Sequence, residues 1–131
     1  MEKQRIDLPE TDSYYLFKDE RKGVCVMAGK AFDADDLISI NYTAIIDWTM
    51  DEQSAFQRHY PMFWTDEHAC IAFGIVNLLN HSSSPNCRLV QDHATHTVRL
   101  ICMQPIKPGE ELVIDYGPEH FPFMSGETAI L

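Results

Sequence analysis

An apolar run in the second half of the chain ends in three consecutive polar side chains. Residues 75–79 are mostly aliphatic, and Asn80, His81 and Ser82 follow them directly. A buried polar group without a hydrogen-bond partner is costly, so a fold that contains this break must supply partners for it. The three side chains either cap backbone groups at an irregular crossing of the chain or form part of a binding site. The break alone leaves both roles open.

A second break of the same kind lies near the other end of the chain. The strand-like run 111–114 ends in Asp115, Tyr116 and Gly117. Taken alone, Tyr116 is typical of a half-buried tyrosine at the end of a strand. We expect the fold to bring the two breaks together.

The rest of the sequence predicts a mostly β protein. Short runs rich in β-branched and aromatic residues alternate with charged, glycine or proline turns. Pro108 and Gly109 occupy the positions that a type II turn prefers, ahead of the last predicted strand. We expect strands near residues 13–17, 24–28, 37–46, 63–64, 69–74, 87–91, 97–103 and 112–114.

One segment carries a clear helix signal. Thr49 and Glu52 form a capping box, in which each side chain satisfies a backbone N–H of the first turn. The predicted helix ends before Pro61, because the residue ahead of a proline avoids the helical conformation. Residues 1–12 are polar and contain Pro9, so we expect a loose N-terminal arm.

The chain is acidic and long enough for one domain. Its 131 residues include 10 Lys and Arg against 20 Asp and Glu, a formal net charge of −10. This charge argues against direct binding to a nucleic-acid backbone and suits a basic partner, such as a lysine-rich peptide. It is also compatible with a surface that only keeps the protein dissolved.

The cysteines predict reduced thiols. They are far apart and form no Cys-x-x-Cys pair, unlike the cysteines of a zinc cluster or a dense disulfide framework; they are Cys25, Cys70, Cys87 and Cys102. The first residues are too polar for a signal peptide, and no apolar run approaches the ~20 residues that span a membrane. We therefore expect a soluble intracellular protein with no membrane partner.

The sequence does not predict a metal site or a hydrolase. His93 and His96 share a predicted hairpin turn, but no third ligand lies near them in the sequence. The chain contains no Gly-x-Ser-x-Gly nucleophile turn and no glycine-rich phosphate loop.

The two breaks, taken together, resemble motifs of the SET-domain family of protein lysine methyltransferases. The resemblance rests on Asn80-His81-Ser82-x-x-Pro85-Asn86-Cys87 and on Pro108-Gly109-Glu110-Glu111-Leu112-x-x-Asp115-Tyr116-Gly117. A weaker match to the family's Gly-x-Gly-Val-Phe-Ala opening is carried by Lys22-Gly23-Val24, with Ala28 and Phe32. The resemblance covers roughly residues 14 to 117, and Arg21 stands where the family has its first glycine.

The resemblance implies a fold and a division of the chain. The expected fold is the SET-domain β-clip, with several small sheets, a C-terminal pseudoknot and one or two short helices. Residues 13–117 would form the SET domain, residues 1–12 an N-terminal arm, and residues 118–131 a flanking segment that closes the site. Because Cys-rich flanking segments are absent from the sequence, the chain is similar to compact viral and bacterial members.

The resemblance also implies S-adenosyl-L-methionine in one pocket and a lysine side chain in a channel from the opposite face. Tyr116 and Tyr42 would be the catalytic residues. The cofactor contacts implied are Arg21, Lys22, Gly23, Asn80, His81, Tyr116 and Phe121. The substrate channel implied consists of Tyr42, Leu89, Ile114 and Phe123.

The implied substrate is a lysine-containing basic protein or peptide, of which a histone tail is the family's commonest example. We expect a monomer or homodimer in the cytoplasm or nucleus, without direct contact to nucleic acid.

Two other functions stay open at this point. The chain could be an inactive SET-like module that binds cofactor or peptide, which Arg21 favours and Tyr116 argues against. It could also be a small β interaction protein in which the polar breaks only connect two crossing segments.

Overall fold

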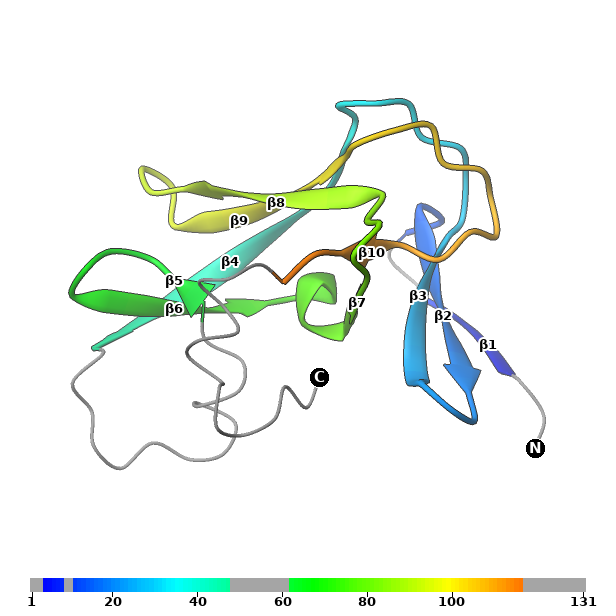
Figure 1. The fold of residues 1–131 in the computed structure, drawn as a ribbon, viewed down its shortest axis with the longest axis horizontal. Helices are drawn as coiled ribbons and strands as arrows, with labels where there is room; N and C mark the ends of the chain where they lie inside the picture. The colour runs from blue at the N-terminus through cyan, green and yellow to red at the C-terminus, as the bar shows by residue number, and fades with distance from the viewer. Residues whose placement is uncertain (1–3, 9–10, 48–61, 117–131) are drawn as a thin grey trace.

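The computed structural model describes residues 4–8, 11–47 and 62–116, and these residues form a mostly β fold of three sheets (Figure 1). The mostly β class predicted from the sequence is confirmed. The predicted helix at residues 49–60 lies outside the described residues. Among those described, no helix is long and apolar enough to cross a membrane.

The first sheet contains the N-terminal strands in chain order. It consists of β1 (Gln4–Asp7), β2 (Tyr14–Asp19) and β3 (Gly23–Ala28), all antiparallel. The prediction of a loose arm over residues 1–12 is wrong for β1. Arg5 donates to Asp7 at 2.7 Å and lies 4.0 Å from the centre of the Tyr15 ring on β2. This pairing is tertiary, so a short polar run gave no local sign of it.

The second sheet has five antiparallel strands in the order β5-β6-β4-β9-β8. The strands are β4 (Leu37–Asp47), β5 (Met62–Phe63), β6 (His68–Phe73), β8 (Cys87–Asp92) and β9 (Thr97–Cys102). The predicted hairpin of β8 and β9 is confirmed. The third sheet pairs only β7 (Asn80–His81) with β10 (Val113–Ile114), in parallel.

The segment that leads into β10 runs along the free edge of β3. Gly109 N donates to Ala28 O, Ala28 N to Glu110 O, and Leu112 N to Val26 O, each at 2.8 Å. The predicted turn ahead of it is present, with Gly109 at a φ of 88°. These bonds carry the C-terminal segment from the first sheet to β7, which lies between the two larger sheets in Figure 1.

The core draws side chains from all three sheets. Its members include Val26 on β3, Cys70 on β6, Leu100 on β9 and Ile114 on β10. All four cysteines are buried and free, as expected for reduced thiols. Burial raises the pKa of Cys70 to about 11 and that of Cys87 to about 12, so both thiols stay protonated at neutral pH.

A buried amide connects the five-stranded sheet to the 3-10 helix η1 (Ile75–Leu78). Asn41 on β4 is 2% exposed and donates from Nδ2 to Val98 O at 3.1 Å, while its Oδ1 accepts from Val76 N at 3.5 Å. Gly74, at a φ of 144°, lets the chain pass beside this amide, because a Cβ atom there would overlap Asn41 Oδ1. The sequence predicted an apolar run here but not η1.

We expect Gly74→Ala to lower the free energy of unfolding by about 3 kcal/mol, from overlap with Asn41 and from strain at positive φ. Gly109→Ala is the matched control. Gly109 also has positive φ, but a Cβ atom there would meet nothing within 4 Å. Strain alone should cost about 1 kcal/mol. Urea denaturation of both variants measures the difference, and equal losses would contradict the role given to Asn41.

Candidate active site

The pairing of β7 with β10 brings the two polar breaks of the sequence together. Asn80 is the register partner of Val113, and His81 is that of Ile114. Ser82 N extends the ladder by donating to Ile114 O at 2.9 Å. The predicted meeting of the two segments is therefore confirmed.

Tyr116 is held on both sides by the segment that contains β7. Its hydroxyl donates to Leu79 O at 2.7 Å, and its backbone N–H donates to His81 Nδ1 at 3.1 Å. The two rings lie 5.1 Å apart between centroids. Because His81 Nδ1 accepts a hydrogen bond, it carries a lone pair, so this geometry requires the tautomer protonated at Nε2. Asp115 Oδ1 lies 3.8 Å from the same nitrogen.

Asn86 fastens the start of β10 from the opposite side. Its Nδ2 donates to Glu111 O at 2.8 Å, and its Oδ1 accepts from Val113 N at 2.9 Å. The Asn86 amide thus bonds to the backbone of residues 111 to 113 as a neighbouring strand would. The chain bends at residues 83–84 on its way from β7 to Asn86, and there Ser84 N donates to Ser82 Oγ at 3.0 Å.

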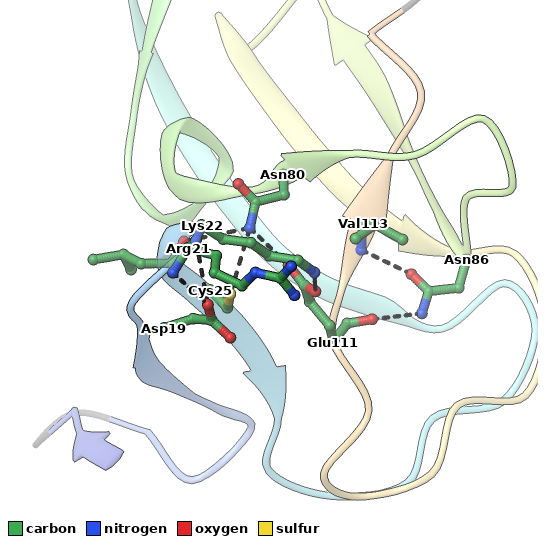
Figure 2. A network of polar contacts seen from close by, with 9 residues as sticks. Asp19, Arg21, Lys22, Cys25, Asn80, Asn86, Glu111 and Val113 are labelled. Atoms are coloured by element: carbon green, nitrogen blue, oxygen red, sulfur yellow. Dashed lines mark hydrogen bonds and ion pairs between the residues drawn. The ribbon is translucent and has the colours of Figure 1, made fainter. Parts of the chain in front are cut away.

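Glu111 is the centre of a polar cluster that joins three distant segments (Figure 2). One carboxylate oxygen accepts from Lys22 Nζ at 2.8 Å, and the other accepts from Asn80 Nδ2 at 2.7 Å. The Glu111 side chain is 17% exposed, whereas that of Lys22 is 54% exposed. The hydrogen bond to Glu111 and its negative charge raise the pKa of Lys22 above 10.5. Lys22 is therefore protonated at neutral pH, and it loses its charge only as pH rises through that raised value.

The turn that presents Lys22 is itself fixed by a carboxylate. Asp19 Oδ1 accepts from the backbone N–H groups of Arg21 and Lys22, at 2.7 and 3.2 Å. Gly23 follows with a φ of 80°, and a Cβ atom there would meet nothing within 4 Å. The backbone at Gly23 therefore faces open space beside the Glu111 cluster.

Residues 23–117 match the model of the SET domain. The chain belongs to the SET-domain family of protein lysine methyltransferases. The match includes Asn80, His81, Glu111 and Tyr116, while Arg21 and Lys22 lie just ahead of it.

A curated relative and a solved structure are similar to this chain. A histone-lysine N-methyltransferase of Schizosaccharomyces pombe, specific for lysine 37 of H3, is 27% identical over 101 residues, which are 75% of this chain and 69% of that protein. A solved Plasmodium falciparum structure, assigned to a histone methyltransferase, has a TM-score of 0.66 and 21% identity. The match covers 82% of this chain and 95% of the Plasmodium falciparum chain. The latter likeness concerns the fold.

The structure gathers several of the residues predicted from the SET resemblance, and in two groups. Asn80 and Lys22 meet at Glu111, and His81 meets Tyr116. The backbone of Arg21 belongs to the Lys22 turn.

The predicted channel residues of the SET domain lie on different elements. Tyr42 on β4 is 70% exposed and is the register partner of the exposed Phe73 on β6. Leu89 is half-buried on β8, and Ile114 is a core residue at 5% exposure. Two further predicted residues, Phe121 and Phe123, lie outside the described part of the chain.

Glu111 lies within one of the two sequence motifs, but the sequence alone indicates no role for it. The signal that could have found it is the position: a carboxylate two residues ahead of the strand that pairs with Asn80. Its partners come from segments 89 and 31 residues away, and that proximity is known only from the fold.

We expect Asn86→Ala to lower the free energy of unfolding by about 1–3 kcal/mol, because it leaves Val113 N and Glu111 O without their side-chain partner. Ser83→Ala, in the exposed part of the same turn, should change it by less than about 0.5 kcal/mol. Urea denaturation measures the free energy of unfolding of both variants, compared with one common slope of free energy against urea concentration. Similar stability for both variants would show that Asn86 does not hold β10.

Proposed function

We propose that this SET domain transfers methyl groups from S-adenosyl-L-methionine to the ε-amine of a lysine in a basic protein or peptide. The observation that carries the proposal is the convergence of Lys22, Asn80, His81 and Tyr116 on the crossing of β7 and β10. The proposed catalytic unit is residues 13–117, extended by β1 because that strand completes the first sheet.

The residues present fit the amino-acid end of this cofactor, which carries a carboxylate and an ammonium. The Lys22 ammonium suits the carboxylate, and the Asn80 amide oxygen, which points away from Glu111 in Figure 2, suits the ammonium. Gly23 leaves the backbone open to close approach. In the proposal, Arg21, His81, Tyr116 and Phe121 complete the contacts, with His81 toward the adenine.

When bound, S-adenosyl-L-methionine supplies an electrophilic methyl group on a sulfonium. The protein must then present a neutral lysine amine in line with that methyl, so positioning contributes most of the rate. Lysine has a pKa of ~10.4 in water, and deprotonating it at pH 7 costs about 4–5 kcal/mol.

An apolar channel reduces that cost, because desolvation disfavours the charged amine. We assign the channel to Tyr42, Leu89, Ile114 and Phe123. The Tyr116 hydroxyl orients the amine beside the methyl, and no strong base is required. The exposed Tyr42–Phe73 pair on β4 and β6 supports a substrate-facing surface there.

The substrate class follows from charge and from the relatives. A net charge of −10 favours a lysine-rich partner. The relative in Schizosaccharomyces pombe is specific for lysine 37 of histone H3. We therefore propose a histone or a similarly basic protein as substrate, which would place the reaction in the nucleus or cytoplasm.

Mass spectrometry of histones and basic peptide arrays, incubated with S-adenosyl-L-methionine, tests the proposal directly. We expect lysines with one or more added methyl groups. Calorimetry with the same protein measures cofactor binding. Binding without methyl transfer to any of these substrates would mean a binding module and overturn the proposal.

Tyr116→Phe should lower kcat by about 100-fold or more while the cofactor Kd stays close to that of the wild type, because it removes the orienting hydroxyl and its bond to Leu79 O but keeps the ring. Tyr15→Phe is the control: it removes a tyrosine hydroxyl on β2, whose ring lies against Arg5, and should leave both quantities unchanged. Asn80→Ala should instead weaken cofactor binding, as measured by calorimetry. Normal rates in both Tyr116→Phe and Asn80→Ala would refute the site assignment.

We also expect repeated methylation of one lysine. In this family a tyrosine that crowds the channel tends to restrict the enzyme to one methyl, and neither of the positions where we look for it, Leu89 and Ile114, is a tyrosine. After exhaustive reaction, mass spectrometry should find di- or trimethyl-lysine. Monomethyl-lysine as the sole product would contradict this expectation.

A further inference from the structure

Three hydrogen-bond acceptors lie near the nitrogen of the Asn80 side-chain amide. Its Nδ2 lies 2.7 Å from Glu111 Oε2, 3.4 Å from Val24 O and 3.5 Å from Cys25 Sγ. If the amide were turned over, Oδ1 would face a carboxylate and a carbonyl, and both contacts would be repulsive. The neighbours therefore require Nδ2 to point inward and Oδ1 to point outward, as Figure 2 shows.

The second oxygen of the same carboxylate holds Lys22. Glu111 Oε1 accepts from Lys22 Nζ at 2.8 Å. One side chain thus connects the turn after β2 to β7. Because its two oxygens serve these two donors, Glu111 acts on the site through Lys22 and Asn80.

We propose that Glu111 is a positioning residue that fixes the Asn80 amide with its oxygen toward the amino group of the cofactor and holds Lys22 on the same wall. The proposal rests on the proposed function, because it takes Asn80 and Lys22 as cofactor contacts. It adds that the Glu111 carboxylate sets the orientation of both side chains.

The physical reason is preorganisation. An Asn80 amide without Glu111 can turn and present its NH2 group to an ammonium, which is a repulsive contact. With Glu111 ionised and largely buried, the inward N–H is a charge-assisted hydrogen bond, and the outward oxygen needs no reorganisation when a ligand binds.

Glu111→Gln is the first test, with Glu110→Gln as the matched control. Glutamine keeps the size of the side chain, but its amide can donate as well as accept, so it no longer enforces one orientation of Asn80. The neighbouring Glu110 accepts instead from Lys107 N at 2.6 Å in the exposed turn. Calorimetry should give a cofactor Kd raised by about tenfold in Glu111→Gln, the size expected for one charge-assisted hydrogen bond, and an unchanged Kd in Glu110→Gln.

A reciprocal exchange tests the orientation itself. Asn80→Asp places a second carboxylate against Glu111, so cofactor binding should weaken strongly. In the double variant Asn80→Asp with Glu111→Gln, the glutamine NH2 can donate to the new carboxylate, whose other oxygen still faces the ligand. We expect the double variant to bind better than Asn80→Asp alone, a rescue that a general loss of stability would not give.

A measurement without cofactor separates this inference from the proposed function. Nuclear magnetic resonance can follow titration of the Lys22 side chain in wild type, Glu111→Gln and Glu110→Gln. The Lys22 pKa, raised by Glu111 in the wild type, should fall only in Glu111→Gln.

The outcomes are distinct. Weaker cofactor binding in Glu111→Gln alone, with rescue in the double variant, supports the inference. Equal Kd values in wild type and Glu111→Gln, equal losses in the two glutamine variants, or no rescue would overturn it while leaving the proposed function standing. If the wild type binds no cofactor, the proposed function fails and the cofactor role of Glu111 fails with it. The Lys22 titration would then still report whether Glu111 holds Lys22.

Discussion

The parallel pairing of β7 with β10 is the contact on which the rest of the site depends. Each strand has only two residues, too few for a stable ladder by itself. Side chains supply what the backbone lacks. Asn86 bonds to Glu111 O and Val113 N, and Tyr116 bonds to the backbone of Leu79. Tyr116 thus supports the crossing and is also one of the proposed catalytic residues.

The crossing is positioned from both sides by larger elements. Backbone hydrogen bonds join the segment 109–112 to the edge of β3, and they fix where β10 begins relative to the first sheet. On the other side, Asn41 and Gly74 set the path of η1 into Asn80. The buried core contains Leu112 and Ile114 together with Leu79, so apolar packing holds the polar crossing in place.

The sequence was most informative where local chemistry decides the structure. The β8–β9 hairpin and the turn at Pro108 and Gly109 follow from β-branched runs and from the preference of glycine for positive φ. The meeting of the two polar breaks could be predicted because each ends an apolar run in side chains that need hydrogen-bond partners. Neither β1 nor the role of Glu111 could be predicted, because each depends on partners that only tertiary packing supplies.

The Glu111 cluster has a consequence for how the protein is made. Its two donors, Lys22 and Asn80, come from the turn at 19–23 and from β7, and the carboxylate comes from the segment before β10. The cluster therefore joins parts from almost the whole described chain. During synthesis, Asn80 and Lys22 emerge before the carboxylate that joins them. A chain that stops short of residue 111 holds both donors and nothing to bring them together. In the order of synthesis, the Glu111 cluster is therefore completed only after every strand of the two larger sheets has been made.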